Sequence, residues 1–194
     1  MPPWPLVASC RKRVYHRVSE MRDDMDWQLH YVAEIKQEEE VLMMRQWEIA
    51  AGRHGALGEL TRMALRPVLD QWCKRKFGYV NFHLTQILSG HGCFGHYLYR
   101  MQKRWSPMCQ QCVRPDNTSK HTLIFCSEWI IGRQRLVSAL DIDSDSLSLM
   151  NIIKEIVVSE DKWTAFSVFA HTIMSGKEEE ERSLRAALLS PTSD

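Results

Sequence analysis

The sequence has no long apolar run, and this absence excludes a membrane-spanning helix. Although 44% of the 194 residues are hydrophobic, no uninterrupted apolar stretch approaches the ~18 residues that such a helix needs. A secretory signal is not expected either, because the apolar run in residues 1–8 is short and the basic cluster Arg11, Lys12 and Arg13 follows it. We therefore expect an intracellular chain with no membrane partner, long enough to bury one sizeable core or two small ones.

Motifs of common catalytic sites are also missing. The sequence contains no G-x-x-x-x-G-K-[ST], no G-x-S-x-G and no H-E-x-x-H. Asp23 and Asp24 resemble a paired metal site but lie inside a helical pattern, and the loop that begins at Asp141 lacks the glycine and glutamate of an EF-hand. We therefore expect no catalytic residue, no small-molecule substrate and no enzymatic activity in this chain by itself.

Proline and glycine are scarce over long stretches, which favours helices. The segment 14–51 has neither residue and is predicted as one helix that packs within its own domain. Pro67 predicts a boundary or kink in the next helical pattern, and the acidic run Glu178 to Glu181 is interpreted as a solvated helix face. No strand series is visible, so we predict a mostly α fold with few or no strands. The further helical patterns cover 59–76, 94–105, 127–140, 149–158, 162–175 and 177–189.

The charges are unevenly distributed along the chain, although the net charge is only +1. Residues 61–135 hold 12 Lys and Arg against 3 Asp and Glu, whereas residues 1–60 hold 8 against 10 and residues 136–194 hold 5 against 11. A basic middle between two acidic flanks can present a positive face to phosphate groups despite the near-neutral total.

Four potential metal ligands lie within eighteen positions, in the pattern Cys109-x2-Cys112-x8-His121-x4-Cys126. A C-x2-C turn can direct two sulfurs at one point, and Zn²⁺ takes four nitrogen or sulfur ligands in a tetrahedron. On a continuous α-helix His121 and Cys126 would lie about 140° apart, so residues 121–125 are predicted to be extended or turned, with Cys126 opening the next helix. Four protein ligands fill the coordination shell, so we expect one structural Zn²⁺ around which the helical module is built.

Two other interpretations of these residues stay open. They can be buried free cysteines beside a surface histidine, or Cys109 and Cys112 can form a redox pair. The redox interpretation leaves the third thiol and the histidine unexplained, and no βαβ pattern surrounds the pair. His91 and Cys93 lie beside a glycine break and are interpreted as residues at a helix start instead of ligands.

Basic and aromatic residues alternate around the predicted zinc site. Such a combination suits neutralisation of a phosphate backbone and stacking on single-stranded bases. The alternative is a solvated basic surface with its tryptophans in the core. The candidate nucleic-acid contacts are Arg100, Lys103, Arg104, Trp105, Arg114, Lys120, Arg133 and Arg135.

One further pattern consists of Leu84 to Phe94, Tyr97, Leu98, the Cys3His set with Asp116 and Thr122, Trp129 and Arg133. In these residues the stretch from Leu84 to Arg133 resembles the C-terminal region of insect non-LTR retrotransposon polyproteins, the part that follows the reverse transcriptase. The resemblance implies a Cys-Cys-His-Cys zinc-binding tail that helps an RNA-directed DNA polymerase to engage RNA or target DNA, in the nucleus during insertion. Its partners would be RNA or DNA and the rest of the polyprotein, whose polymerase and endonuclease residues lie elsewhere. The chain departs from the family at His54, where tryptophan is common.

These observations predict four segments. They are a helical linker or connection at 1–60, a basic zinc-binding module at 61–140, C-terminal helices packed on the module at 141–176, and an acidic helical tail with a frayed end at 177–194. The alternative to nucleic-acid binding is a zinc-stabilised module for protein–protein interaction.

Overall fold

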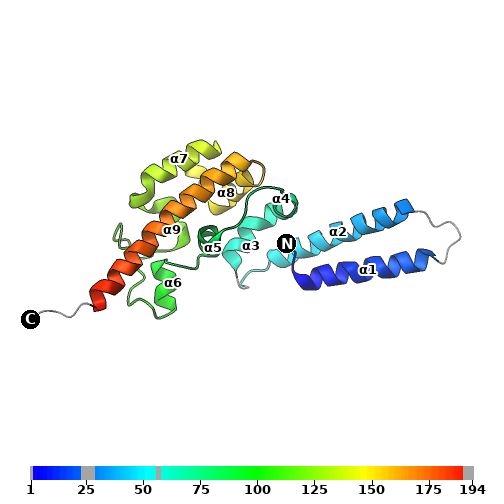
Figure 1. Ribbon diagram of the computed structural model, residues 1–194, viewed down its shortest axis with the longest axis horizontal. Coiled ribbons are helices and arrows are strands. Elements are labelled where there is room, and N and C mark those ends of the chain that lie inside the picture. The colour runs from blue at the N-terminus through cyan, green and yellow to red at the C-terminus, as the bar shows by residue number, and fades with distance from the viewer. Residues whose placement is uncertain (1, 23–28, 56–57, 190–194) are drawn as a thin grey trace, which may run out of the picture. The chain divides into compact units, whose positions relative to one another are not determined.

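The structure is a computed structural model that describes residues 2–22, 29–55 and 58–189. Within these ranges the regular structure consists of nine α-helices and short 3-10 or π turns, without a strand (Figure 1). The predicted mostly α fold is confirmed. The chain divides into two compact units, Met1–Lys74 and Arg75–Asp194. None of the described helices combines the length and the hydrophobicity needed to cross a membrane.

The first unit begins with two helices that pack along each other, α1 (Trp4–Arg22) and α2 (Leu29–Ala51) (Figure 1). The prediction of one helix over 14–51 is therefore wrong. The periodicity of apolar residues shows which face of a helix is buried. It does not show whether that face packs against a second helix formed by the same segment. Helix α1 also begins earlier than expected, at Trp4. Pro5 is tolerated there because it lies in the first turn, where its missing N–H is not needed for a hydrogen bond within the helix. Asp23 and Asp24 lie outside the described residues.

A buried carboxylate joins the two long helices. Glu39 of α2 accepts a hydrogen bond from Arg13 Nε at 2.5 Å and another from Arg17 Nη1 at 3.1 Å. The Arg13 guanidinium holds the pKa of Glu39 below its usual value. Ile35 and Met43 lie one turn before and one turn after Glu39 and are buried as well, so this face of α2 combines apolar packing with the ion pairs.

Three short helical segments complete the first unit: α3 (Glu59–Leu65), a 3-10 turn (Arg66–Val68) and α4 (Leu69–Lys74). Pro67 lies in the 3-10 turn between the two helices, which confirms the predicted boundary. Helices α3 and α4 and the turn between them pack against α2. The boundary between the two compact units therefore falls after Lys74, inside the segment 61–140 that the sequence predicts as one module.

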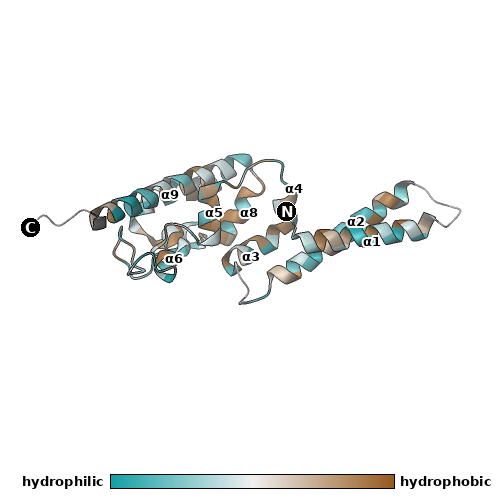
Figure 2. Ribbon diagram, turned by 60° about the horizontal axis from the view of Figure 1, so that its bottom comes forward, coloured by the Kyte–Doolittle hydropathy of each residue, from teal (hydrophilic) through white to brown (hydrophobic). Residues whose placement is uncertain are grey.

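The second unit is organised around its last helix. Helices α5, α7 and α8 pack against α9 (Figure 1), and the apolar colouring is concentrated on α5, α8 and the nearby part of α9 (Figure 2). Phe166 and Ile173 of α9 and Ile152 of α8 are fully buried in the core. The helices of this unit are α5 (Phe82–Ser89), α6 (Gly95–Arg100), α7 (Ile130–Leu140), α8 (Leu149–Ile156) and α9 (Glu160–Leu189).

Helix α9 differs from the prediction in two ways. It is one continuous helix of 30 residues that runs through Gly176. A Cβ at this position would lie 2.8 Å from the Trp129 ring. The glycine provides room for this close packing. The acidic run is also not a uniformly solvated face: Glu179 is exposed, but Glu181 is buried, as is Lys177 just before the run. This part of α9 packs on the segment that carries the predicted metal ligands.

Candidate metal centre

A tight turn places the first two potential ligands. The backbone N–H of Cys109 donates to the carbonyl of Arg114 at 2.9 Å, and the N–H of Val113 donates to the carbonyl of Cys109 at 2.8 Å. Val113 has a φ of 58°, a left-handed conformation that is costly for a β-branched residue. The two hydrogen bonds hold this strained turn closed, with Cys112 inside it.

A π turn places the other two ligands. Residues His121–Phe125 form one wide helical turn, closed by a hydrogen bond of 2.9 Å from the N–H of Cys126 to the carbonyl of His121. Because a π turn links residues i and i+5, it returns Cys126 to the same side as His121. The predicted departure from an α-helix is confirmed, in the form of a wide turn. Cys126 then precedes the 3-10 turn Ser127–Trp129, which leads into α7.

The four ligand atoms of Cys109, Cys112, His121 and Cys126 converge within 4.8 Å of one another. We call this group the Cys3His cluster. The sulfurs of Cys109 and Cys126 are 3.8 Å apart, and a tetrahedral ion with metal–sulfur bonds of ~2.3 Å would separate them by about 3.8 Å. The Cys112 Sγ to His121 Nε2 distance is 3.2 Å, slightly less than the ~3.6 Å of an ideal site. The donor set and its size therefore fit a four-coordinate metal ion.

The alternative interpretations fit the geometry less well. His121 is buried, so it is not a surface histidine beside free cysteines. Cys109 and Cys112 are both free cysteines, and a redox pair of these two would leave unexplained why the ligand atoms of His121 and Cys126 lie within 4.8 Å of theirs. A metal accounts for all four side chains at once.

Burial controls the protonation of the cluster. It raises the pKa of Cys126 to about 12. At Cys112, burial acts in the same direction, but hydrogen bonds from the backbone N–H of Arg114 and from the neighbouring thiols outweigh it and lower the pKa. Burial, followed by the charge of Lys177, lowers the pKa of His121. The imidazole is therefore held in the neutral form that binds metals, whereas the thiol of Cys126 must lose a proton to do so.

We predict that metal affinity rises with pH. Because the raised pKa of Cys126 keeps this thiol protonated in the metal-free protein, each metal bound displaces its proton, and the apparent affinity should increase about tenfold per pH unit for every thiol proton released. Competition with a chelating dye at pH 6, 7 and 8, corrected for the dye's own protonation, measures this slope. Cys93→Ser, which removes a thiol outside the group of four ligands, should keep this slope, and a pH-independent affinity in the unmodified chain would contradict the prediction.

Residues around the cluster fix its backbone. A Cβ at Gly95, the first residue of α6, would lie 2.7 Å from the carbonyl oxygen of Pro107, so the glycine allows α6 to pack directly on the segment before Cys109. The Nε of Arg133 donates to the carbonyl of Leu123 at 2.8 Å, and its Nη2 donates to the carbonyl of Cys126. The π turn is thereby tied to α7.

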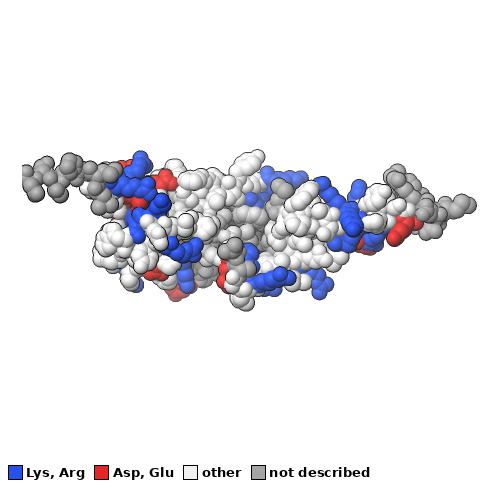
Figure 3. All heavy atoms as spheres, turned by 90° about the horizontal axis from the view of Figure 1, so that it is seen from below, with Lys and Arg blue, Asp and Glu red and all other residues white. Residues whose placement is uncertain are grey.

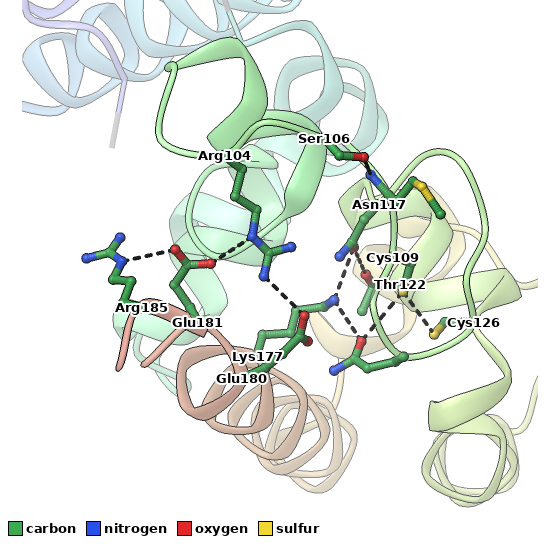
Figure 4. A network of polar contacts seen from close by, with 12 residues as sticks. Arg104, Ser106, Cys109, Asn117, Thr122, Cys126, Lys177, Glu180, Glu181 and Arg185 are labelled. Carbon is green, nitrogen blue, oxygen red and sulfur yellow. Dashed lines mark hydrogen bonds and ion pairs between the residues drawn. The ribbon is translucent and has the colours of Figure 1, made fainter. Parts of the chain in front are cut away.

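A polar network connects the cluster with α9 (Figure 4). The amide oxygen of buried Asn117 accepts hydrogen bonds from Thr122 Oγ1 at 3.3 Å and from Lys177 Nζ at 3.1 Å. Farther along α9, Arg104 forms ion pairs with Glu180 at 3.1 Å and with Glu181 at 2.8 Å. The acidic run thus holds the α6 end of the segment that leads to the cluster.

The candidate nucleic-acid contacts divide into three groups. Arg104 and Arg133 are bound within the protein, by carboxylates and by carbonyls respectively. Trp105 is 83% exposed and lines a groove of about 790 Å³ with Arg100 and Lys103. The remaining candidates are exposed but do not line this groove; they are Arg114, Lys120 and Arg135.

Two residues of this groove that suit a nucleic acid, Tyr99 and Arg185, are not among the candidates predicted from the sequence. Tyr99 is exposed on α6, and Arg185 reaches the groove from α9. The basic–aromatic alternation could have included Tyr99, but Arg185 lies in a segment with net negative charge, where no local signal indicates a basic surface. Figure 3 shows basic side chains, with some acidic ones, gathered over the part of the molecule where Figure 1 places α6 and the end of α9.

Comparisons of the chain with protein-family models, with curated proteins and with solved structures found no match. The chemistry of the Cys3His cluster and of the groove is therefore the basis for a functional proposal.

Proposed function

We propose that this chain is a zinc-stabilised module that binds single-stranded nucleic acid, of the kind expected after the reverse transcriptase of a non-LTR retrotransposon. The observation that carries the proposal is the exposed indole of Trp105 between basic side chains. Because this indole is exposed to solvent, a base can stack on its face, and stacking tolerates any base. Arg100 and Lys103 line the same groove and can neutralise the phosphates on either side of the stacked base.

The charges of the groove support an anionic ligand. Its lining contains four cations, Arg100, Lys103, Arg104 and Arg185, against the single carboxylate of Glu181. That carboxylate is already engaged by Arg104 and Arg185, so its charge is compensated inside the protein. Phosphates entering the groove would therefore meet a net positive lining.

Zinc is the metal that best suits the cluster. Three thiolates and one imidazole in a tetrahedron are typical of structural zinc sites, whereas Mg²⁺ and Ca²⁺ prefer oxygen ligands. With four protein ligands and no open coordination position, the ion would stabilise the fold and would not bind a substrate or water. Trp105 lies four residues before Cys109, so an ion in the cluster would fix the segment that carries one wall of the groove.

The test is binding of a labelled single-stranded RNA, measured by fluorescence anisotropy over a salt series. Trp105→Ala should weaken binding by about 5- to 150-fold, since each stacked base contributes ~1–3 kcal/mol, and should leave the salt dependence unchanged. The double variant Arg100→Glu with Lys103→Glu should weaken binding and also reduce the slope of log affinity against log salt by about 1.4.

Two controls separate these effects from general damage. Trp4→Ala removes another exposed tryptophan, and Lys154→Glu reverses an exposed charge outside the groove; neither should change RNA affinity by more than about twofold. Equal affinities of Trp105→Ala and the unmodified chain, or binding without salt dependence, would remove the proposal. Single-stranded DNA and duplexes in the same assay identify the preferred nucleic acid.

A second function, capture of another protein, is favoured by one observation. Phe125, Ile130 and Ile131 are exposed and close in sequence around Cys126, and contiguous exposed apolar patches mark interaction surfaces. The partner on this proposal is the polymerase part of the same polyprotein. Ile130→Ser with Ile131→Ser should abolish its capture and leave RNA binding intact, whereas the charge reversals at Arg100 and Lys103 should have the opposite effects.

A further inference from the structure

Lys177 is a buried cation whose hydrogen-bond partners are neutral. Its side chain on α9 is 1% exposed. The ammonium donates to Gln111 Oε1 and to Asn117 Oδ1, both at 3.1 Å, and lies 5.8 Å from the centre of the Phe94 ring. Both amides belong to the segment between Cys109 and His121, so the ammonium points into the loops of the cluster (Figure 4).

A buried ammonium needs a nearby negative charge, because amide oxygens and an aromatic face compensate only part of its lost hydration. The acidic neighbours on α9 do not provide a direct partner: Glu180 and Glu181 form their ion pairs with Arg104. Burial lowers the pKa of Lys177, and the groups whose negative charge would raise it are, in order, Cys109, Glu180 and Cys126, the two cysteines only in their thiolate form. Two of these three groups are cluster thiols.

The charge of a metal-loaded cluster matches this cation. Three thiolates and a neutral imidazole around a divalent ion leave a net charge of −1, and one ammonium brings the buried group to zero. A site of four cysteines would carry −2, and a site of two cysteines and two histidines would carry none. The single lysine is therefore matched to the ligand set of Cys109, Cys112, His121 and Cys126.

We infer that Lys177 is the counter-cation of the metal-loaded Cys3His cluster and docks α9 on the loop that carries the ligands. The inference rests on the metal site of the proposed function. Lys177 is a positioning residue: it would not touch the metal, but its charge would stabilise the thiolates, and its bonds to Gln111 and Asn117 would hold their loop. Outer-shell partners of this kind change metal affinity by about 10- to 100-fold.

The first experiment compares Lys177→Met with the unmodified full-length chain. Zinc affinity is measured by competition with a chelating dye, and the site is checked by the absorption of bound Co²⁺. We expect Lys177→Met to bind zinc about 10- to 100-fold more weakly. Lys162→Met, which removes a lysine of the same helix that pairs with Glu155, is the matched control and should retain its affinity. Absence of metal in the unmodified chain refutes the site itself; equal affinities of Lys177→Met and the unmodified chain refute only the role of Lys177.

A second comparison separates charge from packing. Cys112→His changes the loaded cluster to a neutral set of two thiolates and two imidazoles, which needs no counter-cation, so Lys177→Met should cost less than about threefold in that background. An equal cost in both backgrounds would reduce Lys177 to a packing residue and overturn the inference. Lys177→Arg is an independent test of the same point, because it keeps the positive charge. It should retain more zinc affinity than Lys177→Met, and equal losses of zinc affinity in the two variants would again overturn the inference.

Discussion

Removing the metal, or replacing Cys126 with serine, is expected to unfold the unit Arg75–Asp194 under conditions in which the loaded protein is folded. Cys109 and Cys126 are fully buried, and the cluster joins the turn at Cys109 to the π turn before α7. Because such a site does not exist in the unfolded chain, the binding free energy of the metal contributes directly to folding. We expect the free energy of unfolding to fall by several kcal/mol.

Thermal melting followed by circular dichroism, with and without a chelator, measures this loss. Zinc content per chain is determined on the same samples. Cys93→Ser is the matched control, since Cys93 is half-buried in the same unit but lies outside the cluster; its zinc content and its sensitivity to the chelator should match those of the unmodified chain. A Cys126→Ser protein with an unchanged melting temperature and unchanged zinc content would contradict the assignment of the metal site.

The ligand residues of the cluster could be predicted from the sequence because their chemistry is local. Cys109 and Cys112 need only a tight turn, and the spacing from His121 to Cys126 is incompatible with a regular α-helix. The form of the second turn could not be predicted, because an i to i+5 turn has no residue signature that distinguishes it from other turns. The spacing could therefore exclude a regular α-helix, but it could not show which other kind of turn the backbone forms.

Contacts between distant segments could not be predicted in the same way. Nothing in the sequence around Lys177 indicates that it lies 3.1 Å from the side chains of Gln111 and Asn117, because a run of charged residues is most often solvated. The same holds for Arg104, which a count of basic residues places on a nucleic-acid surface. Its true neighbours, Glu180 and Glu181, lie more than seventy positions away in the chain.

This burial makes Arg104→Met the second large expected effect. The side chain of Arg104 is 9% exposed, and its partners Glu180 and Glu181 are 18% and 8% exposed. Removing the cation leaves two carboxylates with little access to water, and breaking a buried pair in this way costs about 3–5 kcal/mol. Urea denaturation should therefore show a decrease of this size in the free energy of unfolding. The surface candidate Lys103→Met should change it by less than about 0.5 kcal/mol.

The control for Arg104 is Arg185, because both residues bind Glu181. Arg185 contacts the carboxylate at 3.0 Å but is 62% exposed, so Arg185→Met should cost less than about 1 kcal/mol. Adding Glu180→Gln and Glu181→Gln to Arg104→Met should recover much of the lost stability, since neutral amides no longer require a cation. If Arg104→Met unfolded like the unmodified chain but bound RNA weakly, Arg104 would act on the nucleic acid directly and its ion pairs would be incidental to the fold. Stability and RNA affinity, measured on the same variants, therefore decide whether the acidic run of α9 stabilises the groove wall or only neutralises its charge.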